Sequence, residues 1–367
     1  MRICMVLDTE PQRHPVGGVE KATHDLCTGL LQAGHDLILI ASGAAGDGPW
    51  AGVPTERVPQ SERRMLLTGA RKWSRMIAER LDGLKPDITH GQGLGYAGGA
   101  VVSWHGGVRV VSAHGNIVED LRYEYSRLGW ALRAPLVRAA ASTALRQADA
   151  VVNVTADWKV NCPVVPGKTT YIPNPVDDAF FAVQAEPETG VVLCLAGPKR
   201  IKGLDILLAA WPQVLCELPD ARLDVYGIED RGGSTWPLNC RIRSATRGSR
   251  ETAEVMRRAS VVVVPSRFEV SPLVAAEAMA VGVPLVATDV GGVRAMTEGV
   301  AGLCGVDPVH IAASIVSALR GSDAWEEKVL EGRKRSAAFR VAKVVDAHVS
   351  LYESLVRSAK PTSHPAS

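Results

Sequence analysis

One stretch of the chain, residues 261–292, constrains the fold more than any other. It reads VVVVPSRFEVSPLVAAEAMAVGVPLVATDVGG, and the four valines at its start predict a buried strand, Val261–Val264. A polar loop and an apolar helix follow, and Gly282 suits the end of that helix. Residues 285–288 predict the next strand. A strand, a loop, a helix and a strand in this order are typical of an α/β fold with a parallel sheet.

The helix of this unit begins at the carboxyl end of a strand, the edge where open α/β sheets bind ligands. Ser271 is expected to cap the helix, with Pro272 at its first position, where a missing N–H costs nothing. The free N–H groups of Leu273 and Val274 and the positive end of the helix dipole favour an anion there. The unit therefore predicts an anion site, most simply a site for a phosphate.

Two carboxylates flank this predicted phosphate site. Glu269 lies in the loop and Glu277 in the helix, with seven residues between them. Carboxylates accept hydrogen bonds from hydroxyl groups. The predicted ligand therefore carries hydroxyl-bearing groups on both sides of its phosphate.

A second loop brings positive charge to the same sheet. The sequence GPKRIKG follows a predicted strand over 191–196 and places three cations before the next helix, namely Lys199, Arg200 and Lys202. A basic loop near a helix N-terminus suits a diphosphate, although a solvated turn would carry the same residues. The chain has no Asp-x-Asp pair, which a diphosphate bound through a divalent cation usually needs, so we predict no metal ion.

The rest of the chain places this unit in the second of two similar halves. A chain of 367 residues is too long for one ordinary core, so two domains are expected. Strands alternate with helices in both halves, and IPNPVD, residues 172–177, predicts a rigid, extended crossover. We expect an α/β protein with two Rossmann-like parallel-sheet domains, 1–175 and 176–340, facing each other across a cleft. Residues 341–367 are expected to add a helix and a disordered tail.

The first half opens with a strand over 2–8 and a helix over 19–33, joined by a loop that ends in Gly17 and Gly18. These glycines allow a bound group to approach the backbone closely, and a tight strand-to-helix turn is the alternative. His114 ends a predicted strand and is expected to reach the cleft as a hydrogen-bonding group, although a structural histidine is the commoner case.

Several other segments are expected to be helical or irregular. Helices are predicted over 121–148, with a break at Pro135, and over 325–357, whereas 43–59 and 231–249 show no strand pattern. The helical segments that contain residues 63–80 and 122–138 are basic. A solvated helix face explains that charge, and contact with an anionic acceptor or a membrane surface is the alternative.

The composition limits the possible location and partners of the protein. Seven cysteines are scattered without a C-x-x-C spacing, which indicates neither disulfides nor a zinc site and favours a reducing cytoplasm. No apolar stretch reaches the roughly 18 residues of a membrane span. A net charge of +2 makes no case for nucleic acid. A cytoplasmic location is expected, and peripheral association with a membrane stays open.

Together these residues resemble the retaining glycosyltransferases of family 4, which have the GT-B fold of two Rossmann-like domains. The stretch from Pro265 to Gly292 is similar to that family's E-x7-E motif and its glycine pair, and IPNPVD is similar to its IPNGVD. GPKRIKGLDILLAAW is similar to its basic loop and helix, and GGVE to its N-terminal glycine loop. SAHGN is similar to the segment that carries the family's histidine, here His114.

The resemblance implies a hexosyltransferase-type enzyme that uses a nucleoside-diphosphate sugar, with UDP or GDP as the nucleotide, and no other cofactor. Glu277 would bond the ribose hydroxyls, and Glu269 the sugar hydroxyls near the transferred carbon. The N–H groups of Leu273 and Val274, the side chains of Arg200 and Lys202, and Ser271 would lie around the diphosphate. The sequence leaves open whether Lys199 or Arg200 replaces the arginine that the family has after the glycine matching Gly197.

Further implications concern the other domain and the reaction. His114 would contact the donor sugar or the acceptor, and Gly17 and Gly18 would approach the diphosphate or an acceptor anion. The C-terminal helix, residues 344–357, would cross back to the first domain. Transfer would retain the anomeric configuration by attack on the front face of the sugar. The acceptor stays open as a small molecule, a glycan or a lipid-linked molecule.

Two other functions are compatible with the same fold. An epimerase that acts on a nucleotide sugar is the first, and the E-x7-E pair, Glu269 and Glu277, argues against it. A non-catalytic protein that binds a nucleotide sugar is the second, because binding alone would also use these carboxylates and cations.

Overall fold

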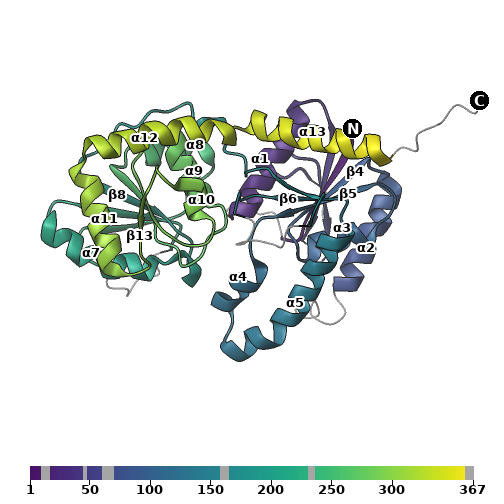
Figure 1. Cartoon of the computed structure of the whole chain (residues 1–367), viewed down its shortest axis with the longest axis horizontal. Coiled ribbons are helices and arrows are strands. Elements are labelled where there is room, and N and C mark those ends of the chain that lie inside the picture. Colours follow the sequence, from purple (N-terminus) through teal and green to yellow (C-terminus); the bar gives the residue numbers. More distant parts are fainter. Residues whose placement is uncertain (10–16, 44–47, 60–69, 158–164, 230–235, 360–367) are drawn as a thin grey trace, which may run out of the picture.

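The computed structural model describes residues 1–9, 17–43, 48–59, 70–157, 165–229 and 236–359. Two parallel sheets lie side by side, each with helices on both faces (Figure 1). The expectation of two α/β units with parallel sheets is confirmed. Within the described residues, no helix is both long enough and apolar enough to cross a bilayer.

The first half forms a seven-stranded sheet with the order β3-β2-β1-β4-β5-β6-β7. Its strands are short, apolar and mostly buried on both faces, as expected for a sheet covered by helices on both sides. The bounds are β1 (Arg2–Leu7), β2 (Asp36–Ser42), β3 (Thr55–Val58), β4 (Ile88–Gln92), β5 (Val108–Ala113), β6 (Ala150–Asn153) and β7 (Thr169–Tyr171).

Helices of the first half connect these strands, with the bounds α1 (Gly18–Gln32), α2 (Ala70–Leu84), α3 (Tyr96–Ser103), α4 (Ile117–Glu124) and α5 (Arg127–Gln147). The predicted break at Pro135 is wrong, because α5 runs through this proline. Pro135 is exposed, so water can bond the carbonyl that the missing N–H leaves unpaired. The chain breaks earlier instead, at Tyr125 and Ser126, where the Ser126 hydroxyl accepts a bond from the Gly129 N–H at 3.2 Å.

The second half forms a six-stranded parallel sheet with the order β10-β9-β8-β11-β12-β13. Its strands are β8 (Val191–Leu195), β9 (Arg222–Tyr226), β10 (Cys240–Arg243), β11 (Val261–Val264), β12 (Leu285–Thr288) and β13 (Gly302–Cys304). Its helices are α7 (Leu204–Glu217), α8 (Ser249–Arg257), α9 (Leu273–Val281), α10 (Val293–Thr297), α11 (Pro308–Arg320) and α12 (Asp323–Ser336), with short 3-10 turns η3 (Asp178–Phe180), η4 (Arg200–Lys202) and η5 (Ala337–Phe339).

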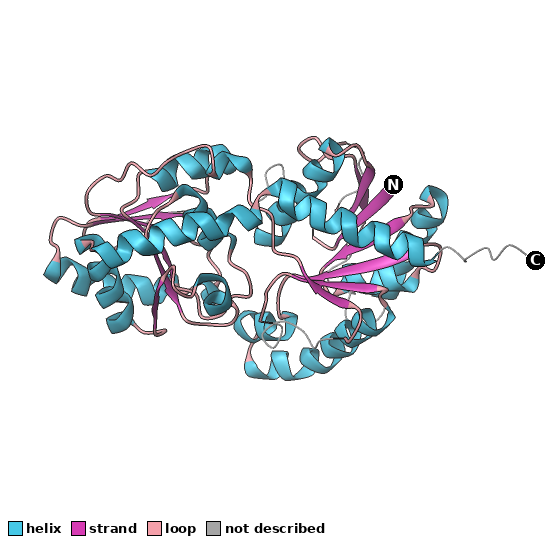
Figure 2. Cartoon of the chain, turned by 45° about the horizontal axis from the view of Figure 1, so that its top comes forward, coloured by secondary structure: helices cyan, strands magenta, loops and turns pink. Residues whose placement is uncertain are grey.

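The chain passes between the two halves twice, at one place. The Val176 N–H donates to the Phe339 carbonyl at 2.7 Å, so the outgoing and returning segments lie side by side. The final helix, α13 (Val341–Ala359), then packs against α1 and lies along the first half (Figure 2). It buries Val344, Val345 and Tyr352 in the core that the first sheet shares. The single helix expected over 325–357 is therefore wrong, since η5 and Arg340 interrupt it where the chain returns.

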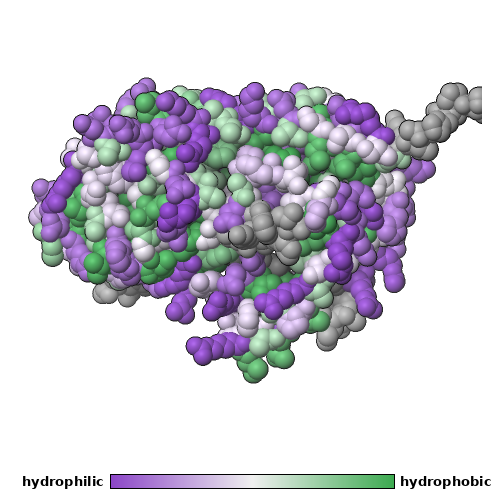
Figure 3. Space-filling view, viewed as in Figure 1, coloured by the Kyte–Doolittle hydropathy of each residue, from purple (hydrophilic) through white to green (hydrophobic). Residues whose placement is uncertain are grey.

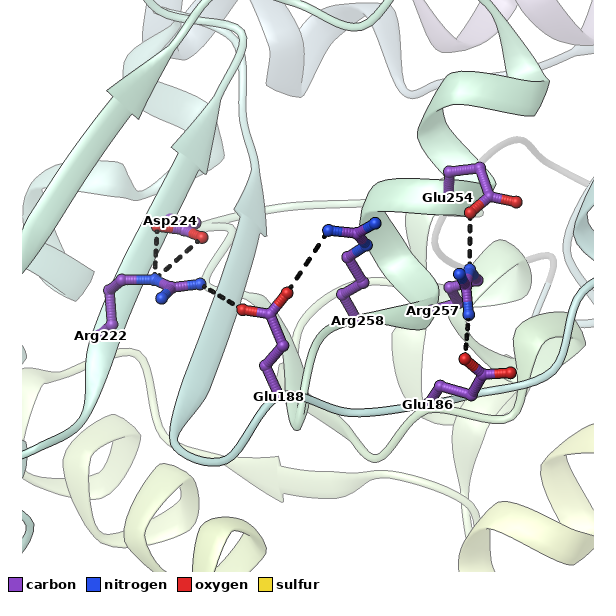
Figure 4. A network of polar contacts seen from close by, with 7 residues as sticks. All are labelled: Glu186, Glu188, Arg222, Asp224, Glu254, Arg257 and Arg258. Carbon is purple, nitrogen blue, oxygen red and sulfur yellow. Dashed lines mark hydrogen bonds and ion pairs between the residues drawn. The ribbon is translucent and has the colours of Figure 1, made fainter.

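The segment after the first crossing is tied to the second half by charged side chains (Figure 4). Arg257 of α8 bonds both Glu186 at 2.5 Å and Glu254 at 2.6 Å, while Arg222 of β9 bonds Glu188 at 3.0 Å. Backbone bonds accompany them, from the Glu186 N–H to the Arg257 carbonyl at 2.8 Å and from the Glu188 N–H to the Arg258 carbonyl at 2.9 Å. Much of this segment is therefore fixed to α8 and β9 rather than spanning free between the two sheets.

Candidate active site

In each sheet the strand order reverses once, between β1 and β4 in the first and between β8 and β11 in the second. Open α/β sheets bind ligands beside such a reversal, at the carboxyl edge of the strands. The loop after β8 carries Lys202 and the loop after β11 carries Glu269, so the two predicted loops of the second half flank its reversal.

Lys202 and Glu269 are in direct contact. The Lys202 ammonium donates to Oε1 of Glu269 at 2.6 Å, and the Ser266 hydroxyl donates to the same oxygen at 3.0 Å. The carboxylate side chain is 15% exposed and the lysine side chain 39% exposed, so the pair remains accessible from one side. An anion and a hydroxyl group could reach this pair together.

Glycines set the path of these loops. Gly203 has φ +68°, and a Cβ built on it would lie 1.9 Å from the Pro265 carbonyl oxygen. Gly291 has φ +53°, and its Cβ would lie 2.0 Å from the Glu269 carbonyl oxygen. The same oxygen accepts a bond from the Gly292 N–H at 2.9 Å. The glycine pair that follows β12 therefore holds the backbone of Glu269 in place.

The start of α9 differs from its prediction. Ser271 does not cap the helix, because α9 begins at Leu273 with Pro272 in the capping position. The Pro272 carbonyl accepts the first helical bonds, from Ala275 at 3.1 Å and Ala276 at 3.3 Å, which moves the cap one residue beyond Ser271. The Ser271 Oγ is buried and has no hydrogen-bond partner among the described residues. Leu273 and Val274 occupy the first turn, where N–H groups have no intrahelical acceptor.

Glu277 lies deeper, on the buried face of α9, and is only 3% exposed. Its Oε1 lies 3.3 Å from the ammonium of Lys21, which belongs to α1 of the other half and also bonds Asp25 at 2.9 Å. Burial raises the pKa of Glu277, and Lys21 partly offsets that rise. Burial alone would lower the pKa of Lys21, but Glu277 and Asp25 outweigh it and raise that pKa above its usual range. The contact thus joins a buried carboxylate and a mostly buried ammonium across the two halves.

The predicted glycine loop of the first half lies against α9. Helix α1 begins at Gly18, with Gly17 in the capping position, and a Cβ built on Gly18 would lie 4.0 Å from Cδ1 of Leu273. Beyond β6, the Thr155 hydroxyl comes closer still to the glycine pair, 2.8 Å from a Cβ built on Gly292. The glycine loop and the Glu269 segment thus lie in the region where the two halves meet.

His114 follows β5 and is held by two amide side chains. Its Nδ1 lies 3.1 Å from Oδ1 of Asn174, and its Nε2 lies 2.6 Å from Oε1 of Gln92, at the end of β4. Burial lowers the pKa of His114 to about 4, so the ring is neutral at neutral pH. A neutral imidazole has one N–H, so it donates to one amide and accepts from the other, whose NH2 group must face the ring.

The three cations of the basic loop differ in their contacts and exposure. Lys202 bonds Glu269, whereas the side chains of Lys199 and Arg200 are exposed. The Arg200 carbonyl accepts a bond from Arg267 at 2.8 Å, which fixes the backbone of this turn. Both side chains are exposed, so the structure does not decide which of Lys199 and Arg200 would meet a diphosphate.

The sequence patterns missed Lys21, Gln92 and Asn174. Lys21 follows the glycine loop by three residues, and Asn174 lies within IPNPVD, so both are close to predicted motifs. Gln92 ends a strand beside the reversal of the first sheet, a position that only the strand order identifies.

Two further observations concern metal binding and a groove elsewhere on the first half. Among the described residues, no three His, Cys, Asp or Glu side chains come together in a way that could hold a metal ion. A surface groove of about 710 Å³, lined by Lys85, His105, Arg109 and Ala359 among others, lies at the amino end of β5, away from the carboxyl edge. The groove therefore has no part in this site.

Comparisons with known proteins agree with the geometry. Residues 16–180 match the family model "Glycosyltransferase Family 4", and residues 189–321 match "Glycosyl transferases group 1". The glycogen synthase of Mycobacterium tuberculosis is 26% identical over 91% of this chain and 90% of its own length. A D-inositol 3-phosphate glycosyltransferase of Geodermatophilus obscurus is 34% identical, over 49% of this chain and 44% of its own length.

Solved structures show the same fold. The sucrose-phosphate synthase of Thermosynechococcus elongatus superposes with a TM-score of 0.79 at 19% identity, covering 98% of this chain and all of that one. Anabaena Alr3699/HepE, solved in complex with UDP, has a TM-score of 0.74 at 15% identity, covering 97% of this chain and all of that one.

Proposed function

The chain belongs to the group 1 and family 4 glycosyltransferases, and from that premise we propose a retaining, metal-independent sugar transfer from a nucleoside-diphosphate sugar to an acceptor hydroxyl. As a glycosyltransferase with the two Rossmann-like domains of the GT-B fold, it is an enzyme that transfers a glycosyl group. The donor class, the stereochemistry and the roles of single residues are argued below from the site.

The observation that carries the proposal is the contact between Lys202 and Glu269 at the reversal of the second sheet. Glu269 is placed to accept hydrogen bonds from sugar hydroxyls, and Lys202 to neutralise a phosphate beside it. The first turn of α9, with the N–H groups of Leu273 and Val274, would face the same phosphate. Arg200 or Lys199 would add a second cation from the exposed side of the loop.

Glu277 would bind the ribose of the donor. It lies about one turn into α9 from Leu273, and its carboxylate is in contact with Lys21. Lys21 offsets part of the rise that burial causes in the pKa of Glu277, which favours the carboxylate form that accepts from ribose hydroxyls. Lys21 therefore joins the donor site as a residue of the first half that supports Glu277.

In the proposed reaction the bond between the anomeric carbon and the diphosphate oxygen breaks. A new bond forms from the acceptor oxygen to the same face of that carbon, and the acceptor proton passes to the leaving phosphate. Negative charge grows on that phosphate as the bond breaks, so Lys202, Arg200 and the α9 N–H groups would stabilise the transition state more than the ground state. His114 is neutral and would donate or accept a hydrogen bond near the sugar, without serving as a strong acid.

The relatives suggest the first compounds to test. UDP and UDP-glucose are the nucleotides named for the Anabaena structures, so UDP-glucose is the first donor, with GDP-sugars second. D-inositol 3-phosphate is named for one group of relatives and glycogen for another, so both are first acceptors.

The test follows the anomeric proton of the donor sugar by NMR during transfer, with and without EDTA. We expect the product to keep the anomeric configuration of the donor and the rate to be unchanged by EDTA. Glu269→Gln should lower kcat/KM by about 100-fold or more, since it removes a charge from the reacting centre. The matched control is Glu217→Gln, an exposed glutamate paired with Arg320 on the far side of the domain, which should keep the parent rate.

Other results of these assays would support one of the two alternative functions. Conversion of the donor sugar into its epimer without release of nucleotide would indicate an epimerase. Nucleotide binding with no turnover for any donor and acceptor would indicate a binding protein. An inverted product, or loss of activity in EDTA that a divalent cation restores, would contradict the retaining or the metal-independent part of the proposal.

A further inference from the structure

Helix α5 has an unusual charge for an exposed helix. Its 21 residues, RLGWALRAPLVRAAASTALRQ, contain four arginines and no aspartate or glutamate. The preceding helix α4 carries Glu119, Asp120 and Glu124 with one cation, Arg122, so of these two helices only α5 has an excess of positive charge. In Figure 1 these two helices project from the body of the first half.

The same helix exposes large apolar side chains. Leu128, Leu132 and Leu136 are 71%, 66% and 51% exposed, and Tyr125, just before the helix, is 42% exposed. The three leucines recur every four residues, so they form one stripe along the helix. Figure 3 shows hydrophobic residues at the lower tip of this projection, with hydrophilic residues beside them.

Three arginines occupy the rest of the helix surface. At 100° per residue, Arg133 lies about 100° from the centre of the stripe in one direction, and Arg138 and Arg127 lie about 120° and about 140° from it in the other. Arg127 and Arg138 are exposed, and Arg133 lies over the ring of Tyr125 at 4.3 Å. A helix with an exposed leucine stripe, and with arginines and no acidic residue on the rest of its surface, fits the boundary between the acyl chains and the anionic headgroups of a bilayer.

We propose that this stripe, Leu128, Leu132 and Leu136, together with the arginines of α5, docks the protein on the surface of an anionic lipid bilayer. Charge complementarity favours this occupant, because α5 carries four arginines and has no acidic residue to pair with them. A second copy of the chain fits less well, since a symmetric contact would set arginine against arginine. The other basic helix, α2, exposes Arg71, Lys72 and Arg75 but no comparable row of leucines.

The surface is near the candidate active site. Helix α4 begins three residues after His114 and packs beside η4, the turn that contains Arg200 and Lys202. One short helix therefore separates the leucine stripe from the proposed donor loop. An acceptor at the bilayer surface would be brought to this side of the enzyme, a consequence that rests on the proposed function, whereas docking itself does not.

The test is cosedimentation of the full chain with phosphatidylglycerol vesicles and with phosphatidylcholine vesicles, each at low and high salt. We expect binding to phosphatidylglycerol that weakens with salt and little binding to phosphatidylcholine. The variant R127A/R138A should bind about 25-fold more weakly, at roughly fivefold for each arginine removed near a charged surface. The variant L128S/L132S/L136S should lose at least roughly tenfold, because the stripe no longer enters the acyl boundary.

Matched controls lie elsewhere on the surface. Leu238 and Leu330 are 76% and 57% exposed in the second half, and Arg320 and Arg357 are exposed on other helices. The variants L238S/L330S and R320A/R357A should bind vesicles like the parent. Melting temperature and nucleotide binding, measured without vesicles, show that each variant is folded and separate docking from the proposed reaction.

Three results would overturn docking at this surface. The parent chain could fail to bind phosphatidylglycerol vesicles at low salt. The α5 variants could bind as tightly as the controls, which would place membrane contact elsewhere. The leucine variant could instead abolish a concentration-dependent dimer seen by sedimentation without lipid, which would make the stripe a contact between copies of the chain.

Discussion

At the scale of single residues, buried histidines form a cluster beside the first sheet that the proposed reaction does not use. Nδ1 of His90 lies 2.6 Å from the Tyr352 hydroxyl, and its Nε2 lies 2.8 Å from the Ser112 hydroxyl. The ring of His348 on α13 lies 5.7 Å from that of His90, and its Nε2 has no partner among the described residues. Burial lowers the pKa of His348 to about 4 and that of His90 well below its usual value.

This cluster predicts how stability falls in mild acid. In the unfolded chain a histidine takes up a proton below pH 6.5, whereas native His348 does so only near pH 4. Between these values the unfolded state binds more protons, so the free energy of unfolding drops as pH falls, by about 1.4 kcal/mol per pH unit for each such histidine. His348→Leu should reduce that slope by about this amount in urea unfolding at pH 6.5, 5.5 and 4.5.

Carboxylates also contribute to acid unfolding, since Arg109 holds the pKa of Asp149 below its usual range against the effect of burial. The carboxylate contribution is the same in His348→Leu and in the parent, so it cancels when the slopes of their unfolding free energies against pH are compared. If both proteins lost stability with the same slope, His348 would be protonated in the folded protein, and the cluster would not be neutral as described.

At the scale of elements, close backbone contacts shape the loops of the site, and they predict which glycines cannot change. Gly203 combines φ +68° with a carbonyl oxygen 1.9 Å from where its Cβ would lie. Gly203→Ala should therefore lower the free energy of unfolding by roughly 2–4 kcal/mol, from backbone strain together with the displaced Pro265 segment. Urea unfolding measures this directly.

Gly99 gives the matched control for that change. It lies inside helix α3, and a Cβ built on it would meet nothing within 4 Å. Gly99→Ala should stabilise the protein by about 0.5–1 kcal/mol, because alanine is the better helix former. Similar unfolding free energies for Gly203→Ala and Gly99→Ala would show that the Pro265 segment yields easily and does not fix the loop.

Apolar runs predicted most of the central strands and long helices, because burial on both faces leaves a clear pattern in the sequence. They missed the edge strands β3 and β10 and the short β7. In β10, CRIR, partly buried and exposed residues alternate, and its place depends on backbone pairing with β9. Such pairing leaves little trace in composition.

The candidate site could also be predicted only in part, because motifs identify residues in one loop or helix but not contacts between distant segments. Motif spacing identified Glu269 and Lys202, whose loops follow strands that flank the reversal. It assigned the helix cap to Ser271, because sequence rules do not fix which carbonyl takes the first helical bond. Lys21 was missed, since its contact with Glu277 forms only when the two halves are packed.

At the scale of the whole molecule, the contact between Lys21 and Glu277 links the two halves through buried charges. A double-mutant cycle with Lys21→Met and Glu277→Gln should give a coupling energy of about 1–3 kcal/mol in unfolding. Each single change leaves one buried group without its partner, whereas the double change removes both charges. The exposed pair Arg357 and Glu353 is the matched control and should couple by less than about 0.5 kcal/mol.

A coupling near zero for the first pair would mean that Lys21 and Glu277 are held apart in solution. The two halves would then meet differently from the arrangement described here. The crossing at Val176 and Phe339 would remain as the link between them.

The central claim is that the second half binds a nucleoside-diphosphate sugar with Glu277 on its ribose, and calorimetric titration tests it most directly. The parent chain should bind UDP or GDP and the matching nucleotide sugar with one site per chain. Glu277→Gln should weaken that binding at least tenfold, since a hydrogen bond to a charged group contributes about 1.5–3 kcal/mol, while Glu217→Gln should leave it unchanged. Absence of binding for every nucleotide, or equal affinity in the parent and Glu277→Gln, would contradict the account.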